Sequence, residues 1–594
     1  MRRLGLMLGL VAVAGCGGRP ERLDTPLPRE IQSVGLSGSV AVRDDGLDRI
    51  LMLTSPSERR LATTGLAVGK NVVHWQVGPH RRRLYVLSEG VRPRLNPDDE
   101  LPSLTIIDGG GVVVEQDSSG GAERSFVQPF VLARYTLDGV PNPKIDIDPW
   151  GEYAVVSLGG GVVENPNELL LVELPPPDAK EPMASGDLEL TPKTIRSFGS
   201  SPEAITFTPP MRYPDGVRRM LIVQTAQEVA LVDLEHPEDE VTVKLSEPIP
   251  GQVTSRPVEV VVHENDPEQF GLLPDEDTAT QARDRYPLIA IRMENESTIP
   301  FLSFEPAPED TMAEEDGIVD TRGVDFLVTV NLAEARGVPE DIDFFWTEVN
   351  DEPVLRLAAV LRTAIDGEYR AALIDPVANR TDFVEVGAPY GHMTRITDEI
   401  ANEPRRSDVA LLWGPQADTV AFWELGTTGS SSFRSVDAHN VNVRVNSVLD
   451  ITQDGSAPSG AEHDFGHLKI LRGSGASDFY VLDLDQRETN PMATPGAQPS
   501  ISLSPDGQRA WVFQQNNAEF ASLRFSDLHP TRLEVERAVV AVHEIAQGDL
   551  AEDGRAVFAL HRVGDALGVT VLDGSDPDTA DTRFYGGILL GGLR

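Results

Sequence analysis

The chain has 594 residues, and its 94 Asp and Glu residues against 51 Lys and Arg residues give a formal charge of −43. Such an acidic surface repels nucleic acid and anionic lipid, so we expect no nucleic-acid partner. Hydrophobic residues make up 40% of the chain, which excludes compositional disorder, and the 52 Gly and 45 Pro residues indicate many turns.

Residues 1–15 have the features of a secretory signal. Two arginines follow Met1, and an uncharged apolar run, LGLMLGLVAVA, extends from residue 4 to residue 14. This run is about half of the ~20 residues that span a bilayer as a helix. It therefore predicts an export signal and not a membrane-spanning segment.

The only cysteine of the chain, Cys16, follows this run in the sequence VAGC. These residues resemble the lipobox of bacterial lipoproteins, whose cysteine receives a diacylglycerol on its thiol and, after cleavage, a fatty acid such as palmitate on its amine. The resemblance implies that the mature chain begins at Cys16 and is anchored stably, because it carries more than one acyl chain. Gly17, in place of Asp, implies the outer membrane of the cell envelope and not the inner one. An ordinary signal peptide with an incidental cysteine is the alternative.

Two further segments follow, a tether and a long β-rich region. Residues 16–34 are rich in Gly, Pro and charge, which predicts a flexible tether. In residues 35–594, short runs of Val, Ile, Leu, Phe and Tyr alternate with Gly, Pro, Asp and Asn, as in β-strands and turns. Because this region has no cysteine, it has no disulfide and its stability must come from core burial.

The strand pattern repeats along the chain. The stretch SISLSPDGQRAWVFQQ is followed by EIAQGDLAEDGRAVFALHR, and Asp506 and Asp553 hold equivalent places 47 residues apart. This period suits one four-stranded propeller blade, and Asp-Gly supplies the backbone angles of a tight hairpin.

A second repeated signal is an Asp at the end of the third strand of many units. The residues are Asp108, Asp233, Asp375, Asp483 and Asp573. The repeats resemble those of YVTN-type and WD-type propellers, which implies a single all-β propeller of four-stranded blades. About nine unevenly spaced anchors indicate seven or eight blades. Other repetitive all-β folds, such as a parallel β-helix or tandem sandwiches, are alternatives.

Ring closure and two insertions complete the prediction of the fold. Residues 38–55 are expected to pair with residues 582–593, which would close the ring and protect its edges. Two acidic stretches, residues 263–286 and 304–323, interrupt the repeat and have few large apolar residues. We expect them to be solvated or disordered loops, or a lid that binds a partner.

Two groups of side chains are candidates for a divalent cation, which is the only cofactor considered. His463 and His467 are four residues apart, the spacing that aligns two imidazoles on a helix, although Gly466 favours two exposed loop histidines. His392 and His439 could converge on a central channel.

The second group is a run of aspartates whose oxygens could wrap a calcium ion. It consists of Asp573, Asp576, Asp578 and Asp581. Their spacing differs from that of an EF-hand loop, which favours a solvated connection.

No catalytic motif is present: the sequence has no nucleophile elbow, P-loop or dinucleotide fingerprint. We therefore expect a membrane-anchored binding or scaffold module for an envelope protein or a glycan, and not an enzyme. The alternative is a lactonase-like or other metal-dependent hydrolase of the propeller type, which rests on fold analogy. Trp413 and Trp511 are expected in the blade core and not on a sugar-stacking surface.

Overall fold

The computed structural model describes the chain from residue 31 to residue 590, with internal gaps. The longest gaps are 159–167, 246–254, 263–287, 307–318, 426–435 and 452–466. The predicted signal, Cys16 and most of the tether therefore lie outside the described residues, as does the acidic stretch 263–286. In the part of the chain that the structure describes, no helix is long and apolar enough to cross a membrane.

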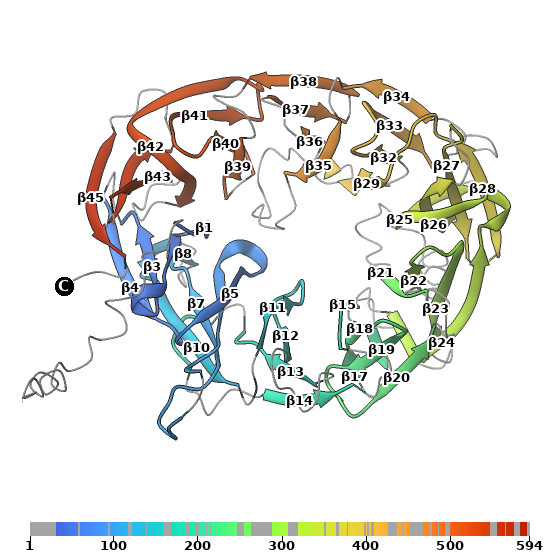
Figure 1. Ribbon diagram of the computed structural model, residues 1–594, viewed down its shortest axis with the longest axis horizontal. Helices are drawn as coiled ribbons and strands as arrows, with labels where there is room; N and C mark the ends of the chain where they lie inside the picture. The colour runs from blue at the N-terminus through green and yellow to red at the C-terminus, as the bar shows by residue number, and fades with distance from the viewer. Residues whose placement is uncertain are drawn as a thin grey trace, which may run out of the picture.

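The molecule is a ring of four-stranded antiparallel sheets, which we call blades 1–10 (Figure 1). Blade 1 contains β1 (Ser33–Gly35), β2 (Val40–Asp44), β3 (Arg49–Thr54) and β4 (Ala62–Ala67). Blade 2 contains β5 (Val72–Val77), β6 (Arg83–Ser88), β7 (Ser103–Asp108) and β10 (Phe130–Thr136). Blade 3 contains β11 (Pro141–Ile147), β12 (Tyr153–Leu158), β13 (Glu168–Glu173) and β14 (Leu190–Thr194). Blade 4 contains β15 (Ala204–Phe207), β18 (Met220–Gln224), β19 (Glu228–Asp233) and β20 (Glu240–Lys244).

The next four blades follow the same order. Blade 5 contains β21 (Pro257–Val262), β22 (Leu288–Met293), β23 (Thr298–Pro306) and β24 (Val319–Asn331). Blade 6 contains β25 (Gly337–Val349), β26 (Glu352–Thr363), β27 (Arg370–Asp375) and β28 (Arg380–Glu385). Blade 7 contains β29 (His392–Ile396), β32 (Val409–Trp413), β33 (Thr419–Glu424) and β34 (Val436–Asn440). Blade 8 contains β35 (Val445–Asp450), β36 (Leu468–Gly473), β37 (Asp478–Asp483) and β38 (Glu488–Ala493).

Blades 9 and 10 share one long strand, β42 (Pro530–Ala546). Blade 9 contains β39 (Ser500–Leu503), β40 (Arg509–Phe513), β41 (Asn517–Arg524) and the first part of β42. The second part of β42 pairs with β43 (Arg555–Val563) and is followed by β44 (Ala566–Asp573) and β45 (Arg583–Leu589). The described residues thus form seven separate four-stranded sheets, one blade within a six-stranded sheet and two within a seven-stranded sheet, which make ten blades.

The prediction of one all-β propeller with four-stranded blades is confirmed, but the ring has more blades than the seven or eight expected. Unequal blade lengths explain the difference. Blade 2 extends from Val72 to Thr136 because it carries an inserted hairpin, whereas blades 9 and 10 have no link between them. A fixed period of about 47 residues cannot count such units.

Side chains that point alternately to the two faces of each strand build the hydrophobic core between neighbouring blades. Consecutive side chains of a strand point to opposite faces. In β22, Ala290 packs toward blade 6, whereas Ile289 and Ile291 pack toward blade 4. Nine such clusters of buried apolar residues join every pair of neighbouring blades around the ring.

The ring closes through one of these clusters, and the predicted pairing of residues 38–55 with 582–593 is wrong. Strands β2 and β3 pair with each other, and β45 pairs with β44. Blade 1 instead packs on blade 10, where Val40 and Leu51 share a buried cluster with Phe558. We call this contact the seam. Apolar side chains packed between the faces of blades 1 and 10 therefore close the ring, in place of the predicted pairing of strands from the two ends of the chain.

The aspartates at the ends of third strands are confirmed in position and have a structural role. Asp108, Asp233, Asp375, Asp483 and Asp573 end β7, β19, β27, β37 and β44. In each of the first four, Oδ1 accepts a hydrogen bond from a backbone N–H two or three residues later, at 2.8–3.1 Å. Such Asx turns start the turn toward the fourth strand.

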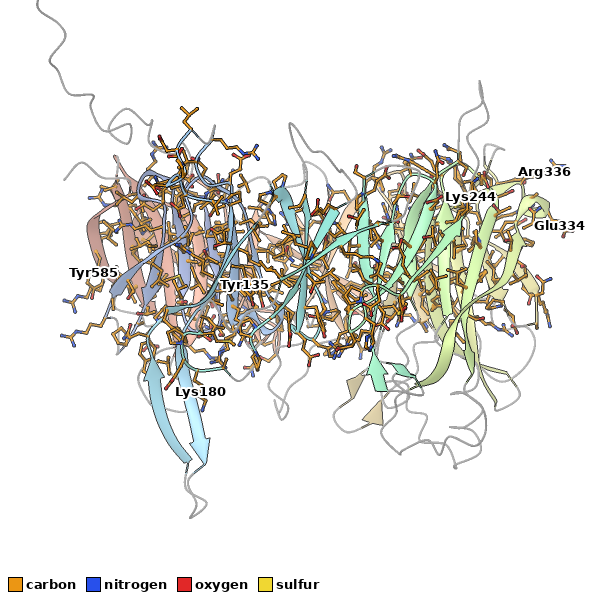
Figure 2. The ribbon with its side chains drawn as sticks, turned by 90° about the horizontal axis from the view of Figure 1, so that it is seen from below. Tyr135, Lys180, Lys244, Glu334, Arg336 and Tyr585 are labelled. Atoms are coloured by element: carbon orange, nitrogen blue, oxygen red, sulfur yellow. The ribbon has the colours of Figure 1, made fainter. Side chains whose placement is uncertain are left out.

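The antiparallel order gives the ring two different faces. We call the face with the loops between second and third strands, and with the links between blades, the upper face. Lys244 lies on it in Figure 2. The lower face carries the hairpin of β8 (Gly111–Gln116) and β9 (Ala122–Val127), seen below the ring near Lys180. The short helices η2 (Asp45–Leu47) and η4 (Ala333–Ala335) lie on the upper face, and η3 (Pro79–Arg81) lies on the lower one.

Two smaller hairpins also belong to the lower face. They are β16 (Met211–Tyr213) with β17 (Gly216–Arg218), and β30 (Glu399–Ile400) with β31 (Glu403–Pro404). Strand β16 pairs in parallel with the start of β24 and so fastens blade 4 to blade 5. The acidic stretch 304–323 was predicted to be a loop, but its residues 304–306 end β23 and its residues 319–323 begin β24, and the two strands pair with each other. Residues 307–318, between these strands, lie outside the description.

Candidate functional site

The first strands of blades 5, 6 and 7, with the second strand of blade 5, bring six charged or titratable side chains together. Each blade's first strand lies toward the centre of the ring, and β25 contacts β21, β22 and β29 (Figure 1). We call the group the inner-strand cluster. It consists of Glu259 on β21, Arg292 on β22, Asp341 and Asp343 on β25, and His392 and Arg395 on β29.

The sequence of β25 explains why two carboxylates point to the same side. A β-bulge lies between Pro339 and Asp341, and the strand alternates regularly after it. Ile342 and Phe344 are buried in the core toward blade 5. Asp341 and Asp343 therefore face the other way, and both are only partly buried.

Two of the three carboxylates are paired with guanidinium groups. Arg292 Nε donates to Glu259 Oε2 at 2.5 Å, and Arg395 Nη2 donates to Asp343 Oδ1 at 2.8 Å. Asp341 instead accepts the backbone N–H of Met393 on Oδ2 at 2.7 Å. The same oxygen lies 3.9 Å from His392 Nδ1.

This arrangement shifts the pKa values of three groups. Burial, and then the nearby charge of Glu259, raise the pKa of Asp341 to about 7. Burial also raises the pKa of Glu259, although Arg292 opposes that shift, and burial lowers the pKa of His392. A carboxyl group that titrates near neutral pH beside a neutral imidazole can exchange protons with a ligand.

Trp413 holds the imidazole of His392 in place. The two rings are stacked, with centroids 4.5 Å apart and an interplanar angle of 27°. Trp413 Nε1 donates to Thr394 Oγ1 at 2.9 Å, which fixes the indole in turn. Trp413 is partly buried and packs against the core between blades 7 and 8 while its ring supports His392, and Trp511 is completely buried as expected.

A pocket of about 730 Å³ opens on the upper face next to this cluster. The loops between second and third strands of blades 5–7, together with the links between these blades, form its walls. Its lining includes Arg292, Glu340, Arg362, Tyr390, His392 and Gln416. Arg362 crosses the wall, donating to Asn295 Oδ1 at 3.1 Å and lying 3.6 Å from Glu340 Oε1. The pocket therefore presents planar polar groups and aromatic rings to a ligand.

In the part of the chain that the structure describes, the metal-ligand candidates from the sequence do not lie together. Four of these candidates lie outside the description: His463, Asp576, Asp578 and Asp581. His467 precedes β36 in blade 8, whereas Asp573 ends β44 in blade 10. Among the described residues, no group of three or more His, Cys, Asp or Glu side chains is arranged to hold a metal ion.

The predicted convergence of His392 and His439 is wrong. His392 lies on the first strand of blade 7 and His439 on the fourth, which form opposite edges of the sheet. His439 Nε2 is 3.1 Å from Asp437 Oδ2, and its ring contacts Phe422 edge-on. Only His392 belongs to the site.

Sequence reasoning missed the carboxylates and arginines of the inner-strand cluster. The signal that could have found them is the segment Glu340–Asp343, where acidic residues alternate with Ile342 inside a strand pattern. Charges at alternate positions of a strand indicate one polar face. Their partners on blades 5 and 7 are distant in sequence, so the cluster itself could not be predicted.

Comparisons with known proteins identify a fold likeness and no family. No family model matches the chain, and no curated protein matches it. A structure of dihydro-heme d1 dehydrogenase NirN covers 73% of this chain and 71% of its own, with a TM-score of 0.36 and 10% identity. The Dos1 propeller covers 70% of this chain and 89% of its own, with a TM-score of 0.36 and 10% identity.

AztD from Citrobacter koseri is a third similar structure. It covers 84% of this chain and 95% of its own, with a TM-score of 0.32 and 8% identity. At these TM-scores and identities, the likeness carries no argument about a site, a ligand or an activity.

Proposed function

We propose that this protein is a lipoprotein of the cell envelope, anchored by Cys16 to the outer membrane, whose propeller binds a glycan in the pocket of blades 5–7. The observation that carries the proposal is the composition of that pocket. Planar carboxylate, amide and guanidinium groups can each bind two neighbouring hydroxyls, and aromatic rings can stack on the apolar face of a sugar.

The volume and the polarity of the pocket support this ligand class. Natural ligand pockets have about 300–1,000 Å³, and the pocket of about 730 Å³ falls in this range. Glu340 and Gln416 supply hydrogen-bonding groups, and the partly exposed rings of Tyr369 and His392 lie on the same lining, whereas Tyr390 is buried in the core. A flat apolar protein interface would need a different composition.

The position of the first strand supports an anchor on the same side as the pocket. Strand β1 runs in the direction of β3, so it begins on the upper face at Ser33. The segment between Cys16 and Ser33 spans at most about 60 Å when fully extended, at about 3.5 Å per residue. A lipid anchor at Cys16 would therefore keep the upper face of the ring near the outer membrane.

Glycan binding is tested by isothermal titration of the full-length chain with neutral oligosaccharides of the malto, cello and chito series. We expect one series to bind, and we expect Glu340→Ala and Gln416→Ala each to weaken its binding at least tenfold. Glu385→Ala on the outer strand of blade 6 is the matched control and should bind normally. If no oligosaccharide binds, or if the pocket variants bind like the control, the glycan proposal is wrong.

The anchor is tested separately by mass spectrometry of the mature N-terminus. We expect an acylated Cys16, and release of the Cys16→Ser variant from the outer-membrane fraction. An unacylated mature terminus at another residue would contradict the anchor and leave the pocket proposal untouched.

Hydrolysis beside the same pocket is a second candidate. Asp341 does not line the pocket, but its Oδ2 lies 3.9 Å from Nδ1 of the lining residue His392, and burial raises the pKa of Asp341 to about 7. Such a pair could activate water for attack on a lactone or ester. The test is turnover of lactones of four to eight ring atoms, with and without added divalent cation. Activity that disappears in Asp341→Asn would support a lactonase-like hydrolase, and no turnover by the wild type would refute it.

A further inference from the structure

His392 lies between the pocket of blades 5–7 and a carboxylate that is not part of its lining. The imidazole lines the pocket and is half exposed, whereas Asp341 does not line it. Asp341 Oδ2 lies 3.9 Å from His392 Nδ1. Among the described residues, the other ring nitrogen, Nε2, has no hydrogen-bond partner. Nε2 is therefore the nitrogen that a ligand in the pocket can bind.

Both side chains are held by contacts that leave them free to pair with each other. His392 stacks on Trp413 through the face of its ring, with centroids 4.5 Å apart, so the nitrogens on its edge stay open. Asp341 Oδ2 accepts the Met393 N–H at 2.7 Å, and a carboxylate oxygen has a second lone pair for another donor. A movement of about 1 Å would bring Oδ2 and Nδ1 to hydrogen-bond distance.

Charged groups of blades 5, 6 and 7 surround this pair. They are Glu259, Arg292, Asp343, Arg395, Glu340 and Arg362. The first four form the two ion pairs of the inner-strand cluster. Burial lowers the pKa of His392, and the charge of Glu340 opposes that shift because it favours a proton on the ring. Glu340 lines the pocket, so it and Asp341 attract the proton of the neutral imidazole from different places.

We propose that the charge on Asp341 decides which nitrogen of His392 carries the proton, and so whether Nε2 offers a ligand an acceptor or a donor. We call this coupling the His392 switch. Ionised Asp341 accepts Nδ1–H, which leaves the lone pair of Nε2 for a ligand hydroxyl. Protonated Asp341 no longer attracts Nδ1–H, so the charge of Glu340 holds the proton on Nε2, which then donates to a ligand oxygen. If the ring itself takes up the extra proton, Nε2 is protonated as well.

The switch operates near neutral pH and distinguishes two substituents of a sugar. The pKa of Asp341 is about 7, so both of its charge states are populated there. A hydroxyl can donate or accept, whereas the carbonyl oxygen of an acetamido group only accepts. This step rests on the proposed glycan function and deepens it. Acidic conditions favour an N-acetylated sugar at Nε2, and alkaline conditions favour a sugar with a hydroxyl in its place.

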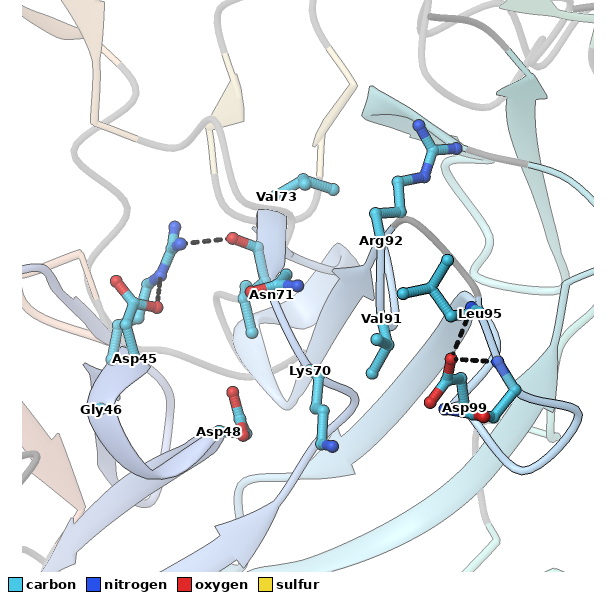
Figure 3. Close-up of a pocket in the computed structure, with 13 residues that line it drawn as sticks. Asp45, Gly46, Asp48, Lys70, Asn71, Val73, Val91, Arg92, Leu95 and Asp99 are labelled. Atoms are coloured by element: carbon cyan, nitrogen blue, oxygen red, sulfur yellow. Dashed lines mark hydrogen bonds and ion pairs between the residues drawn. The ribbon is translucent and has the colours of Figure 1, made fainter. Parts of the chain in front are cut away.

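A second pocket of the upper face supplies a matched control. It lies between blades 1 and 2, has the same volume of about 730 Å³, and its lining includes no histidine (Figure 3). Asp99 Oδ2 accepts the backbone N–H groups of Leu95 and Asn96 there, both at 2.8 Å. Asp99→Asn therefore removes the charge of a pocket carboxylate that is remote from His392.

The first test needs no ligand. Diethyl pyrocarbonate acylates an imidazole nitrogen that has a free lone pair, and peptide 381–395, released by trypsin, contains His392 as its only histidine. In the wild type, we expect acylation of His392 to become about fourfold faster between pH 6.5 and pH 8, as a group with a pKa of about 7 ionises. Asp341→Asn should change the rate less than about twofold over this range, because the lowered pKa of His392 keeps the ring neutral. Asp99→Asn should behave like the wild type.

The second test is isothermal titration of the full-length chain with chitotetraose and cellotetraose at pH 6 and pH 8. The acetamido groups of the first sugar stand where the second has hydroxyls. We expect the ratio of the two affinities, chitotetraose over cellotetraose, to fall at least threefold from pH 6 to pH 8 in the wild type and in Asp99→Asn, and to stay constant in Asp341→Asn.

Two results would overturn the switch. One is an acylation profile that is the same in the wild type and in Asp341→Asn, or a rate that falls as the pH rises. The other is an affinity ratio that is independent of pH in the wild type. If neither sugar binds, the glycan function fails, and the acylation profile decides the switch by itself.

Discussion

Two places on the inner strands of the ring use a histidine in opposite ways. At the seam, His543 of β42 is buried, and its Nε2 lies 2.9 Å from Ser33 Oγ of β1. In the inner-strand cluster, His392 is half exposed and stacks on Trp413. Apolar residues of blades 10 and 1 pack at the seam, whereas carboxylates and guanidinium groups surround His392. The same strand position therefore closes the ring at the seam and carries a polar cluster beside a pocket in blades 5–7, depending on the residues that flank it.

The largest expected effect is at the seam. Phe558 is completely buried between blades 10 and 1, so Phe558→Ala should lower the free energy of unfolding by about 3–5 kcal/mol. Urea unfolding followed by intrinsic fluorescence measures the change. Arg395→Lys in the inner-strand cluster should cost less, and an equal loss in both variants would contradict the division of roles.

The second prediction concerns Asp341, whose folded-state pKa of about 7 exceeds its ordinary value of 3.8. The folded state binds the proton more tightly, so this group stabilises the fold at low pH and loses that contribution as pH rises from about 4 to 7. Asp341→Asn should become more stable than the wild type across this window, by at most about 4 kcal/mol at about 1.4 kcal/mol per pKa unit.

Unfolding midpoints of both proteins between pH 4 and pH 8 test this prediction. Asn keeps an oxygen that can accept the Met393 N–H, so the comparison isolates the charge. A constant difference between the two proteins over the whole range would show that Asp341 titrates normally.

The third prediction has the opposite sign. Burial, with the charge of Arg81, lowers the pKa of His543 to about 4 from its ordinary 6.5. The unfolded state binds more protons between these values, so stability falls as pH drops from about 6.5 to 4. His543→Gln should remove this acid sensitivity, about 3 kcal/mol across the window. The slope of the unfolding free energy against pH measures it, and an unchanged slope would contradict it.

The smallest effect is expected at the third-strand aspartates. Asp375 Oδ1 accepts the backbone N–H of Ala378 at 2.8 Å in an exposed turn. Asp375→Ala should cost about 0.5–1.5 kcal/mol, the net worth of one hydrogen bond, and Asp375→Asn should restore most of it. Thermal unfolding of the two variants compares them, and equal losses would indicate that charge and not the turn matters.

Local sequence patterns predicted most of the fold but little of the candidate site. Strands and the aspartates that end them are set by neighbours in sequence, so Asp108 and Asp233 could be placed in advance. The number of blades was wrong because the blades differ in length, as in blade 2, which extends from Val72 to Thr136 with an inserted hairpin. The predicted closure of the ring by strand pairing was wrong because apolar packing between the faces of two blades cannot be recognised from the order of strands along the sequence.

The inner-strand cluster depends on contacts across three blades. Glu259 and Arg395 are 136 residues apart, and only the ring brings them to the same place. His392 lies in the inner-strand cluster, but the partner considered for it, His439, lies on the opposite edge of the blade. Composition alone cannot distinguish the inner strand of a blade from the outer one.

The manner of closure has a consequence for rearranging the chain. In the part of the chain that the structure describes, no strand of blade 1 pairs with a strand of blade 10, and the two blades meet through a cluster of apolar side chains. A circular permutant that joins the ends by a linker and starts in the link between blades 3 and 4 would keep every sheet whole. The boundary between blades 9 and 10 is different, because β42 belongs to both sheets and a new terminus there would interrupt a strand.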